Sequence, residues 1–320
     1  MILILSDEHE PTTDLVIDWL LYYKKDFIRI SEENSIKLHS IYKKENAFEA
    51  VFIVIKEDNE EIYINTSQVT SFWYRRSRLN VEIPQIYLDN TNFQAIFNSF
   101  ILEEYESAIR FLYFILSQKK NVNKFEDTYL SKMDVLYEAL KLNIPIPDTI
   151  ICSNKKDLIA FFNKHKGKII TKTIGDPTAL YWNDLKLYTS QVNLDEIPDF
   201  FCLSLFQEML DKLFEIRTFY LNGTFFSSAI FSQKDEKTKI DFRQYNEELP
   251  NRVVPYKIPV EIENKLRLLM DHLKLNSGSI DIVYTKNHQY VFLEVNPLGQ
   301  FEQVSFPCNY NLFKEIAIAL

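Results

Sequence analysis

Three oxygen-bearing side chains near the carboxyl end of the chain have the spacing of a metal site. Residues 278–297 read as two alternating strands around the turn Asn287-His288. A two-residue loop at this turn places Asp281 opposite Glu294 on the neighbouring strand. Asn296 follows Glu294 by two residues, so its side chain lies on the same strand face. The spacing therefore predicts that the three side chains converge.

Two facing carboxylates repel each other unless a cation lies between them. Oxygen ligands of this kind suit Mg²⁺, which also takes nucleotide phosphate oxygens into its coordination shell, and Mn²⁺ would accept the same ligands. The residues thus favour a magnesium-nucleotide site. Taken alone, such a pattern is more often a solvated sheet face that carries charges by chance, so the hypothesis depends on further motifs.

Two lysines lie where a phosphate-binding protein would need them. Lys132 opens a helix, and Lys172 lies inside the apolar strand expected over 168–174. A lysine in the middle of an apolar strand costs free energy unless its ammonium group reaches water or meets an anion. Reaching water is the commoner explanation for a single lysine, so these two support phosphate binding only together with other motifs.

The turn Asn222-Gly223 predicts a second hairpin, in which 214–221 pairs with 224–230. Glu215 and Arg217 then share one face of the sheet, while the apolar residues beside them fill the other face. A face of this kind can do chemistry. An exposed cross-strand ion pair explains the same two residues equally well.

A β-like run ends directly before this second hairpin. Its apolar positions include Leu203, Leu205 and Phe206. A strand end can offer backbone N–H and C=O groups to a flat heterocycle such as a nucleotide base. The candidate base contacts at the end of the run are Gln207, Glu208, Met209 and Leu210.

The first 120 residues predict a small α/β domain. Residues 1–5 and 27–30 read as strands on either side of a helix over 13–23, whose N-cap is Thr12 or Thr13. This β-α-β opening predicts a parallel pair of strands. The other elements expected here are a hairpin (50–56 with 61–65), a strand (69–74) that leads into Arg75, Arg76 and Arg78, and a long helix (91–118).

The pattern changes after residue 120. A helix leads into Ile144-Pro145-Ile146-Pro147, which cannot be helical because each proline lacks an N–H and restricts the residue before it. The remainder is expected to be mostly strand up to a helix over 260–273. The helix before the prolines is expected over 130–141. After them we expect a strand over 150–152 and a helix over 155–164.

The composition excludes several classes of protein. Of 320 residues, 46% are hydrophobic and 25% charged, which is typical of a globular chain, and the net charge of −9 argues against a sequence-independent nucleic-acid binder. Only five glycines occur and none precedes Gly167. A Rossmann fingerprint and a P-loop both need clustered glycines, so any nucleotide is bound by another device.

Cysteine content and hydropathy indicate a cytoplasmic protein without a membrane partner. The chain has three widely spaced cysteines, which supports neither a zinc site nor a disulfide framework. The opening MILILSDEHE lacks the basic region of a signal peptide, and the longest strongly apolar stretch, 111–116, is too short to cross a membrane. We therefore expect neither nucleic acid nor membrane among its partners.

The order of these motifs resembles the ATP-grasp ligases from about residue 123 to 320. The ordered set is more specific than any of its parts. The resemblance implies an α/β (α+β) ATP-grasp fold with an N-terminal α/β pre-ATP-grasp domain over 1–120, a central lid subdomain over 121–200 and a C-terminal antiparallel-sheet catalytic subdomain over 201–320. The matching residues are Lys132, Ile144 to Pro147, Lys172, Gln207-Glu208, Glu215, Arg217, Arg243, Asp281 and Glu294 to Pro297.

The resemblance also implies a role for each matching residue. The nucleotide, expected to be ATP, would be held at its phosphates by Lys132 and Lys172, at its base by Gln207, Glu208, Met209 and Leu210, and at its ribose by Glu215. The ligands of Mg²⁺ would be Asp281, Glu294 and Asn296. The arginines that hold the transferring phosphate and the acyl phosphate would be Arg217 and Arg243.

The likeness is closer still to the graspetide (microviridin-type) ligases, which cyclise ribosomal peptides, especially those of the grasp-with-SPASM type. These relatives often have a glycine directly after the double arginine, where this chain has Ser77. The features that carry the likeness are the opening ILILSDEHEPTTDLVIDWL with FIRI, the strand Phe72 to Arg76, the triplet Asp241-Phe242-Arg243, and the ending Asn296 to Phe301 with Pro307 to Asn311.

Such enzymes transfer the γ-phosphate of ATP to a side-chain carboxylate, which a Thr or Ser hydroxyl or a Lys amine then attacks. The resemblance implies a ribosomally made precursor peptide as substrate, with a leader and a core of Thr/Ser and Asp/Glu, and it also fits a homodimer. Arg75, Arg76 and Arg78 are candidate contacts to acidic peptide groups. A solvated loop is the simpler explanation for each arginine taken singly.

Two other functions fit parts of the same sequence. An ATP-grasp ligase that adds amino acids to a peptide tail, or joins free amino acids, would use the same nucleotide machinery. A binding module that kept the fold but lost catalysis would have damaged metal ligands, and Asp281, Glu294 and Asn296 are all present. The first domain and the C-terminal ending favour the macrocyclase over the amino-acid ligase.

Overall fold

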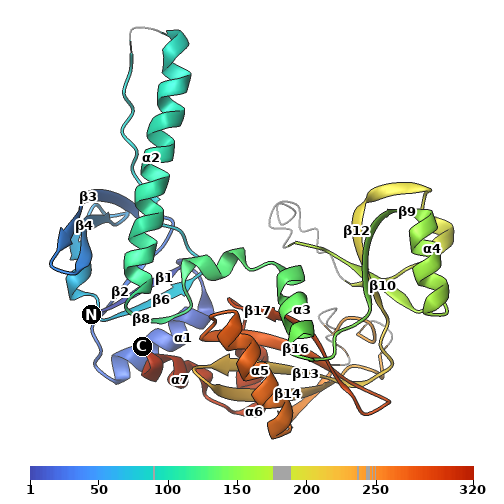
Figure 1. The fold of residues 1–320 in the computed structure, drawn as a ribbon. Helices are drawn as coiled ribbons and strands as arrows, with labels where there is room; N and C mark the ends of the chain where they lie inside the picture. The colour runs from blue at the N-terminus through green and yellow to red at the C-terminus, as the bar shows by residue number, and fades with distance from the viewer. Residues whose placement is uncertain (89–90, 176–188, 236–237, 243–245, 247, 249) are drawn as a thin grey trace. The chain divides into compact units, whose positions relative to one another are not determined.

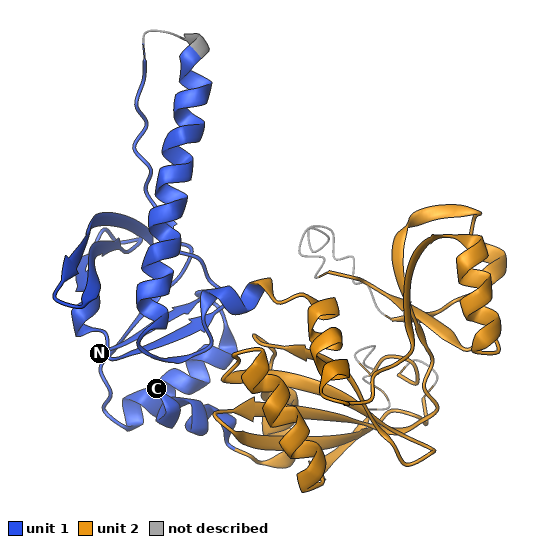
Figure 2. Cartoon of the chain, in the orientation of Figure 1, with its two compact units in different colours: residues 1–128, 311–320 blue, residues 129–310 orange. Residues whose placement is uncertain are grey.

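The chain forms two compact units in the computed structural model (Figure 2). One unit contains residues 1–128 together with 311–320, and the other contains residues 129–310. The division at residues 120 and 200 stays a prediction. The structure describes residues 1–320 apart from 89–90, 176–188, 236–237, 243–245, 247 and 249.

The first unit contains a parallel sheet and an open, mostly antiparallel sheet (Figure 1). The strand order is β2-β1-β6-β8 in the parallel sheet and β5-β4-β3-β7 in the other. Helices α1 and α7 pack against each other. The elements are β1 (Ile2–Ser6), α1 (Pro11–Tyr22), β2 (Phe27–Ile30), β3 (Ser35–Lys44), β4 (Ala47–Ile55), β5 (Glu61–Asn65), β6 (Ser71–Arg75), β7 (Asn80–Val81), α2 (Thr91–Ser117), β8 (Lys120–Val122) and α7 (Leu312–Ala319).

The β-α-β opening and its parallel strand pair are confirmed. The predicted N-cap is wrong, because Glu10 rather than Thr12 or Thr13 caps α1, and its carboxylate accepts the Thr13 N–H at 2.6 Å. Strand β3 was not predicted. Most of its residues are exposed or half-buried, and a bulge between Leu38 and Ser40 interrupts its alternation.

The second unit contains a four-stranded and a five-stranded sheet, with strand orders β11-β10-β12-β9 and β15-β14-β13-β16-β17. No helix in the described part of the chain is both long and apolar enough to cross a membrane. The elements are α3 (Lys132–Lys141), β9 (Thr149–Asn154), α4 (Lys155–Lys164), β10 (Ile169–Lys172), β11 (Ser190–Gln191), β12 (Phe200–Glu208), β13 (Lys212–Leu221), β14 (Thr224–Phe231), β15 (Arg252–Tyr256), α5 (Val260–His272), β16 (Ser277–Thr285), β17 (Tyr290–Asn296) and α6 (Glu302–Cys308).

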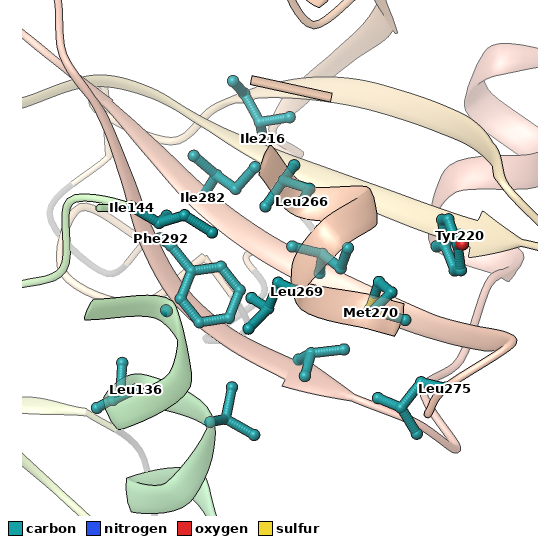
Figure 3. Close-up of a cluster of buried hydrophobic side chains, with 14 of the residues drawn as sticks. Leu136, Ile144, Ile216, Tyr220, Leu266, Leu269, Met270, Leu275, Ile282 and Phe292 are labelled. Atoms are coloured by element: carbon teal, nitrogen blue, oxygen red, sulfur yellow. The ribbon is translucent and has the colours of Figure 1, made fainter. Parts of the chain in front are cut away.

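Helices α3 and α5 cover one face of the five-stranded sheet with a continuous apolar core (Figure 3). Ile216 and Ile282 project from the sheet into this core, where Leu269 of α5 is fully buried. Full burial of one such side chain stabilises a fold by about 1.5–3 kcal/mol. Because strand side chains alternate, the neighbouring Arg217 and Asp281 lie on the opposite face of the sheet. The core therefore fixes the face on which polar residues gather.

Both predicted hairpins form in this sheet. The first has the predicted pairing, and Asn222 and Gly223 both adopt positive φ, as a type I′ turn requires. The second pairs Asp281 with Glu294 as predicted. Its predicted two-residue loop is wrong. The Thr285 N–H donates to the Gln289 carbonyl at 3.0 Å, so the loop has three residues, 286–288.

Candidate nucleotide and metal site

A cavity of about 280 Å³ lies within the second unit and is lined by strands of both sheets. Its lining includes most of the residues that the sequence predicts for a nucleotide and a metal. Three other predicted site residues that the structure describes do not line the cavity: Lys132, Arg217 and Asn296. The predicted site residues that do line it are Lys172, Gln207, Glu208, Met209, Leu210, Glu215, Asp281 and Glu294.

The two predicted carboxylate ligands face each other across β16 and β17. Arg217 donates to both carboxylate oxygens of Asp281 at 3.1 and 3.2 Å, and the Lys172 ammonium lies 3.9 Å from Glu294 Oε2. Cationic groups from two other strands thus offset the repulsion between the carboxylates. Asn296 is exposed and lies two residues beyond Glu294 on the same strand face.

The donor set at this pair fits a hard divalent cation. Two carboxylates and an amide supply only oxygen ligands, and Mg²⁺ commonly completes its shell with water and phosphate oxygens. Within the described parts of the chain, no group of three or more His, Cys, Asp or Glu side chains is placed to hold a metal. Any metal bound here would therefore depend on Asp281, Glu294, the Asn296 amide and ligands from outside the protein.

Arg217 carries a buried donor with no hydrogen-bond partner. The residue is 8% exposed, its guanidinium pairs with Asp281, and its Nε has no acceptor among the described residues. A buried unsatisfied donor costs about 1–3 kcal/mol. This donor is suited to an acceptor that arrives with a ligand, and the planar guanidinium favours phosphate or carboxylate.

Glu215 is buried in the cavity wall beside an unpredicted lysine. The Lys212 ammonium donates to Glu215 Oε1 at 2.5 Å and to the Ile240 carbonyl at 2.9 Å, and the Ser232 hydroxyl also donates to Glu215 at 3.0 Å. Burial raises the pKa of the Glu215 carboxyl, and the neighbouring Lys212 ammonium opposes that rise. Lys212 thus helps to keep a charged acceptor inside the cavity.

The regular alternation of strand side chains does not predict that Lys212 lies beside Glu215. An odd spacing from Glu215 places the two residues on opposite faces of a regular strand. A bulge between Lys212 and Phe214 shifts the register and brings the lysine to the face of Glu215. In the sequence, only the short polar segment before the strand, which includes Asp211, indicates an irregular strand start here.

The candidate base segment is fixed by backbone hydrogen bonds to the residues directly before β9 and β10. The Glu208 N–H donates to the Asp148 carbonyl at 3.0 Å, and the Met209 N–H donates to the Lys168 carbonyl at 2.9 Å. Gln207 is buried, and its side-chain amide donates to Thr149 Oγ1 at 3.0 Å. The end of β12 therefore forms a fixed wall of the cavity.

The remaining predicted residues lie elsewhere. Lys132 is half-buried at the first position of α3, directly after the N-cap Ser131. Arg243 lies outside the described residues. Arg75 is 2% exposed in the first unit and forms a 3.1 Å ion pair with Glu10. The two other arginines proposed to contact peptide, Arg76 and Arg78, are exposed.

Comparison with known proteins identifies the fold. No family model and no curated protein matches the chain. Among solved structures, the macrocyclase MdnC bound with the precursor peptide MdnA from Microcystis aeruginosa MRC is 25% identical, with a TM-score of 0.76 over 100% of this chain and 99% of that one. The Chryseobacterium gregarium RiPP-associated ATP-grasp ligase in complex with ADP and a leader and core peptide is 22% identical, with a TM-score of 0.76 over 99% and 94% of the two chains.

A third solved structure extends the likeness to lower identity. The ATP-grasp ligase PsnB, complexed with a phosphomimetic variant of its minimal precursor, Mg and ADP, is 13% identical, with a TM-score of 0.67 over 99% of this chain and 96% of that one. At this identity the likeness concerns the fold alone. The grasp-with-SPASM subtype stays a prediction. Over its full length the chain therefore has the ATP-grasp fold of these macrocyclase and ligase structures.

Proposed function

We propose that the chain is an ATP-dependent peptide macrocyclase. It phosphorylates an Asp or Glu side chain of a ribosomally made precursor peptide and condenses it with a Thr or Ser hydroxyl, or a Lys amine, to form an ω-ester or ω-amide ring. The observation that carries this proposal is the single cavity in which Lys172, the base segment 207–210 and the Asp281–Glu294 pair meet. The likeness to MdnC and to the Chryseobacterium ligase supports the peptide substrate.

ATP is the nucleotide that this cavity would take. The base would lie against the backbone at the end of β12, where Glu208, Met209 and Leu210 form the wall. Glu215 would accept hydrogen bonds from the ribose hydroxyls. Lys172 would neutralise phosphate charge from inside the cavity, and Lys132 would do so from the first turn of α3.

Asp281, Glu294 and Asn296 would hold Mg²⁺, and Mn²⁺ would accept the same ligands. When bound, the metal supplies Lewis-acid neutralisation of phosphate charge. Arg217 and Lys172 lie beside the same carboxylates and offset their repulsion. Arg217, through its unpartnered Nε, and Arg243 would hold the transferring phosphate and the acyl oxygen.

The proposed reaction has two steps. A carboxylate oxygen of the peptide attacks the γ-phosphorus, the bond to the β-phosphate oxygen breaks, and ADP leaves. A hydroxyl or amine of the same peptide then attacks the acyl carbon, loses its proton and expels inorganic phosphate. The peptide loses the elements of one water per ring. The protein supplies position and charge neutralisation, and needs no covalent intermediate of its own.

The remaining partner assignments follow from the same proposal. Arg76 and Arg78, both exposed in the first unit, would contact acidic groups of the precursor peptide, whereas Arg75 is already engaged by Glu10. The enzyme would work in the cytoplasm as a homodimer. Its cysteines support a reducing compartment, because Cys152, Cys202 and Cys308 all have free thiols.

Intact-mass spectrometry of precursor peptides tests the proposal. Peptides with Thr/Ser and Asp/Glu cores are incubated with the enzyme, ATP and Mg²⁺, and we expect the loss of one or more waters together with ADP. The variant Glu294→Gln should abolish both changes, whereas Glu261→Gln, at an exposed position of α5, should leave them intact. A mass gain equal to a supplied free amino acid would instead establish the tail-ligase activity and refute macrocyclisation.

A further inference from the structure

A second cavity, of about 320 Å³, lies behind the segment that we assign to the nucleotide base. Residues 208–210 of this segment line both cavities, so they form a wall with one side toward the nucleotide and one side toward the second cavity. The second cavity also contains His165, which has no role in the proposed reaction. Whatever holds this wall in place determines where its backbone meets the base.

The imidazole of His165 lies between two carboxylates behind the wall, with a hydrogen bond to one of them. Its Nε2 lies 2.9 Å from Asp148 Oδ2, and its Nδ1 lies 3.8 Å from Glu208 Oε2. The two acidic residues are themselves linked, because the Asp148 N–H donates to Glu208 Oε1 at 2.9 Å and the Glu208 N–H donates to the Asp148 carbonyl at 3.0 Å. The Glu208 side chain is thereby held by Asp148 beside His165.

The backbone of His165 reaches the same wall by a second route. Its carbonyl accepts the Lys168 N–H at 3.0 Å, and the Lys168 carbonyl accepts the Met209 N–H at 2.9 Å. Side chain and backbone of one residue thus fix two consecutive positions of the wall, Glu208 and Met209. The ring of Phe161, with its centroid 4.6 Å from that of His165, holds the imidazole in place.

The lysines at this cluster are more exposed than His165. Lys164 binds Asp148, and Lys168 lies 3.2 Å from Asp211, but the two lysine side chains are 65% and 53% exposed against 14% for His165. Exposed ion pairs contribute little to rigidity because water screens them and the long side chains stay flexible. The hydrogen bond from Lys164 holds the pKa of Asp148 below its usual range, so this carboxylate stays charged beside the imidazole.

We propose that His165 is a positioning residue that sets the affinity and selectivity of the enzyme for its nucleotide base. By engaging Asp148 and Glu208, it turns the Glu208 carboxylate toward the second cavity and presents the backbone of 208–210 to the base in one fixed arrangement. Adenine and guanine differ in which edge atoms donate and accept hydrogen bonds, so a fixed backbone discriminates between them and a loose one does so less. This inference rests on the proposed nucleotide site.

Calorimetric binding of Mg·ADP and Mg·GDP to three variants tests this role. His165→Phe keeps a ring beside Phe161 but has no nitrogen atoms, His165→Gln keeps an amide donor for Asp148, and His39→Phe changes an exposed histidine of the first unit. We expect His165→Phe to weaken ADP binding about 10-fold, which is the scale of one lost hydrogen bond to a charged group, and to lower the ADP-over-GDP preference. His165→Gln should recover most of both, and His39→Phe should change neither.

Steady-state kinetics with ATP and a precursor peptide provide the second readout. A positioning role predicts a raised KM for ATP in His165→Phe with kcat within about twofold of wild type, because saturating ATP restores the complex. Wild-type ADP affinity and selectivity in a folded His165→Phe would overturn the inference and leave the proposed function intact. Equal losses in His165→Phe and His165→Gln would also overturn it, because they indicate a general packing role. Failure of the wild-type protein to bind Mg·ADP would refute the nucleotide site itself.

Discussion

Asp281 and Glu294 face each other because two irregularities of one hairpin cancel. The turn contains one residue more than the sequence predicts, which shifts the pairing by one position up to Ile282 and Phe292. A bulge at Leu293 shifts it back, so the two carboxylates are again directly opposite. Without this bulge, a one-residue slip would turn Glu294 into the apolar core. The bulge therefore places both carboxylates of the proposed metal site.

Removing either carboxylate should strongly slow phosphoryl transfer. We expect Asp281→Asn and Glu294→Gln each to lower ATP turnover by about 100-fold or more, because a bound cation contributes several kcal/mol of charge stabilisation. A coupled ADP-release assay with peptide measures the change, and Glu261→Gln is the matched control. Full turnover in both variants would show that the metal is held elsewhere.

Arg217 should act in the chemical step rather than in folding. Arg217→Lys keeps a positive charge near Asp281 but removes Nε and the planar fork, so we expect kcat to fall by about 100-fold with little change in KM for ATP. Arg252→Lys, at an exposed position of β15, is the control. An unchanged kcat would assign the unpartnered Nε to structure alone.

Lys212 should support nucleotide binding through Glu215. In Lys212→Met the buried carboxyl loses the ammonium that opposes its raised pKa, so Glu215 binds a proton more readily and becomes a poorer acceptor for ribose. We expect the Kd for Mg·ADP to rise about 10-fold. Calorimetry beside the exposed control Lys257→Met measures this, and an unchanged Kd would separate Glu215 from the nucleotide.

Asp127 should make the first unit less stable as pH rises. Burial raises the pKa of this carboxyl to about 6 from an ordinary value of 3.8, so between these values the folded state binds a proton that the unfolded state has released. The free energy of unfolding therefore falls across this window, by up to about 3 kcal/mol for a shift of this size.

The variant Asp127→Asn removes this titration and should flatten the decline. Urea unfolding at pH 4 and pH 7 measures it, with Glu126→Gln, an exposed neighbour, as control. We expect Asp127→Asn to be more stable than wild type at pH 7 and similar to it at pH 4. A wild-type free energy that stays level across the window would contradict the raised pKa.

Local patterns predict much of this fold, and tertiary interactions account for what they miss. The turn Asn222-Gly223 has one favoured geometry, so its hairpin follows from two residues. Helix α7 belongs to the first unit although it closes the chain, and it packs on α1, which no local spacing indicates. The periodicity of a sequence does not predict which elements far apart in the chain pack together.

In the candidate site too, some residue positions follow from local patterns and others do not. Alternation and turn geometry place Asp281 opposite Glu294, whereas Lys212 reaches Glu215 only through a bulge that no sequence pattern marks. His165 meets Glu208 only because α4 and β12 pack side by side with β9. Regular strands can be derived residue by residue, but their irregularities decide which further side chains enter the site.

The proposed reaction requires that ATP activates a side-chain carboxylate of a peptide. A precursor peptide that carries a heavy oxygen isotope in its Asp and Glu carboxyl groups tests this most directly. Because the attacking carboxylate oxygen stays on the transferred phosphorus, we predict one labelled oxygen in the released phosphate for each ring formed. Ring formation with unlabelled phosphate would contradict the acyl-phosphate step and with it the proposed use of this cavity.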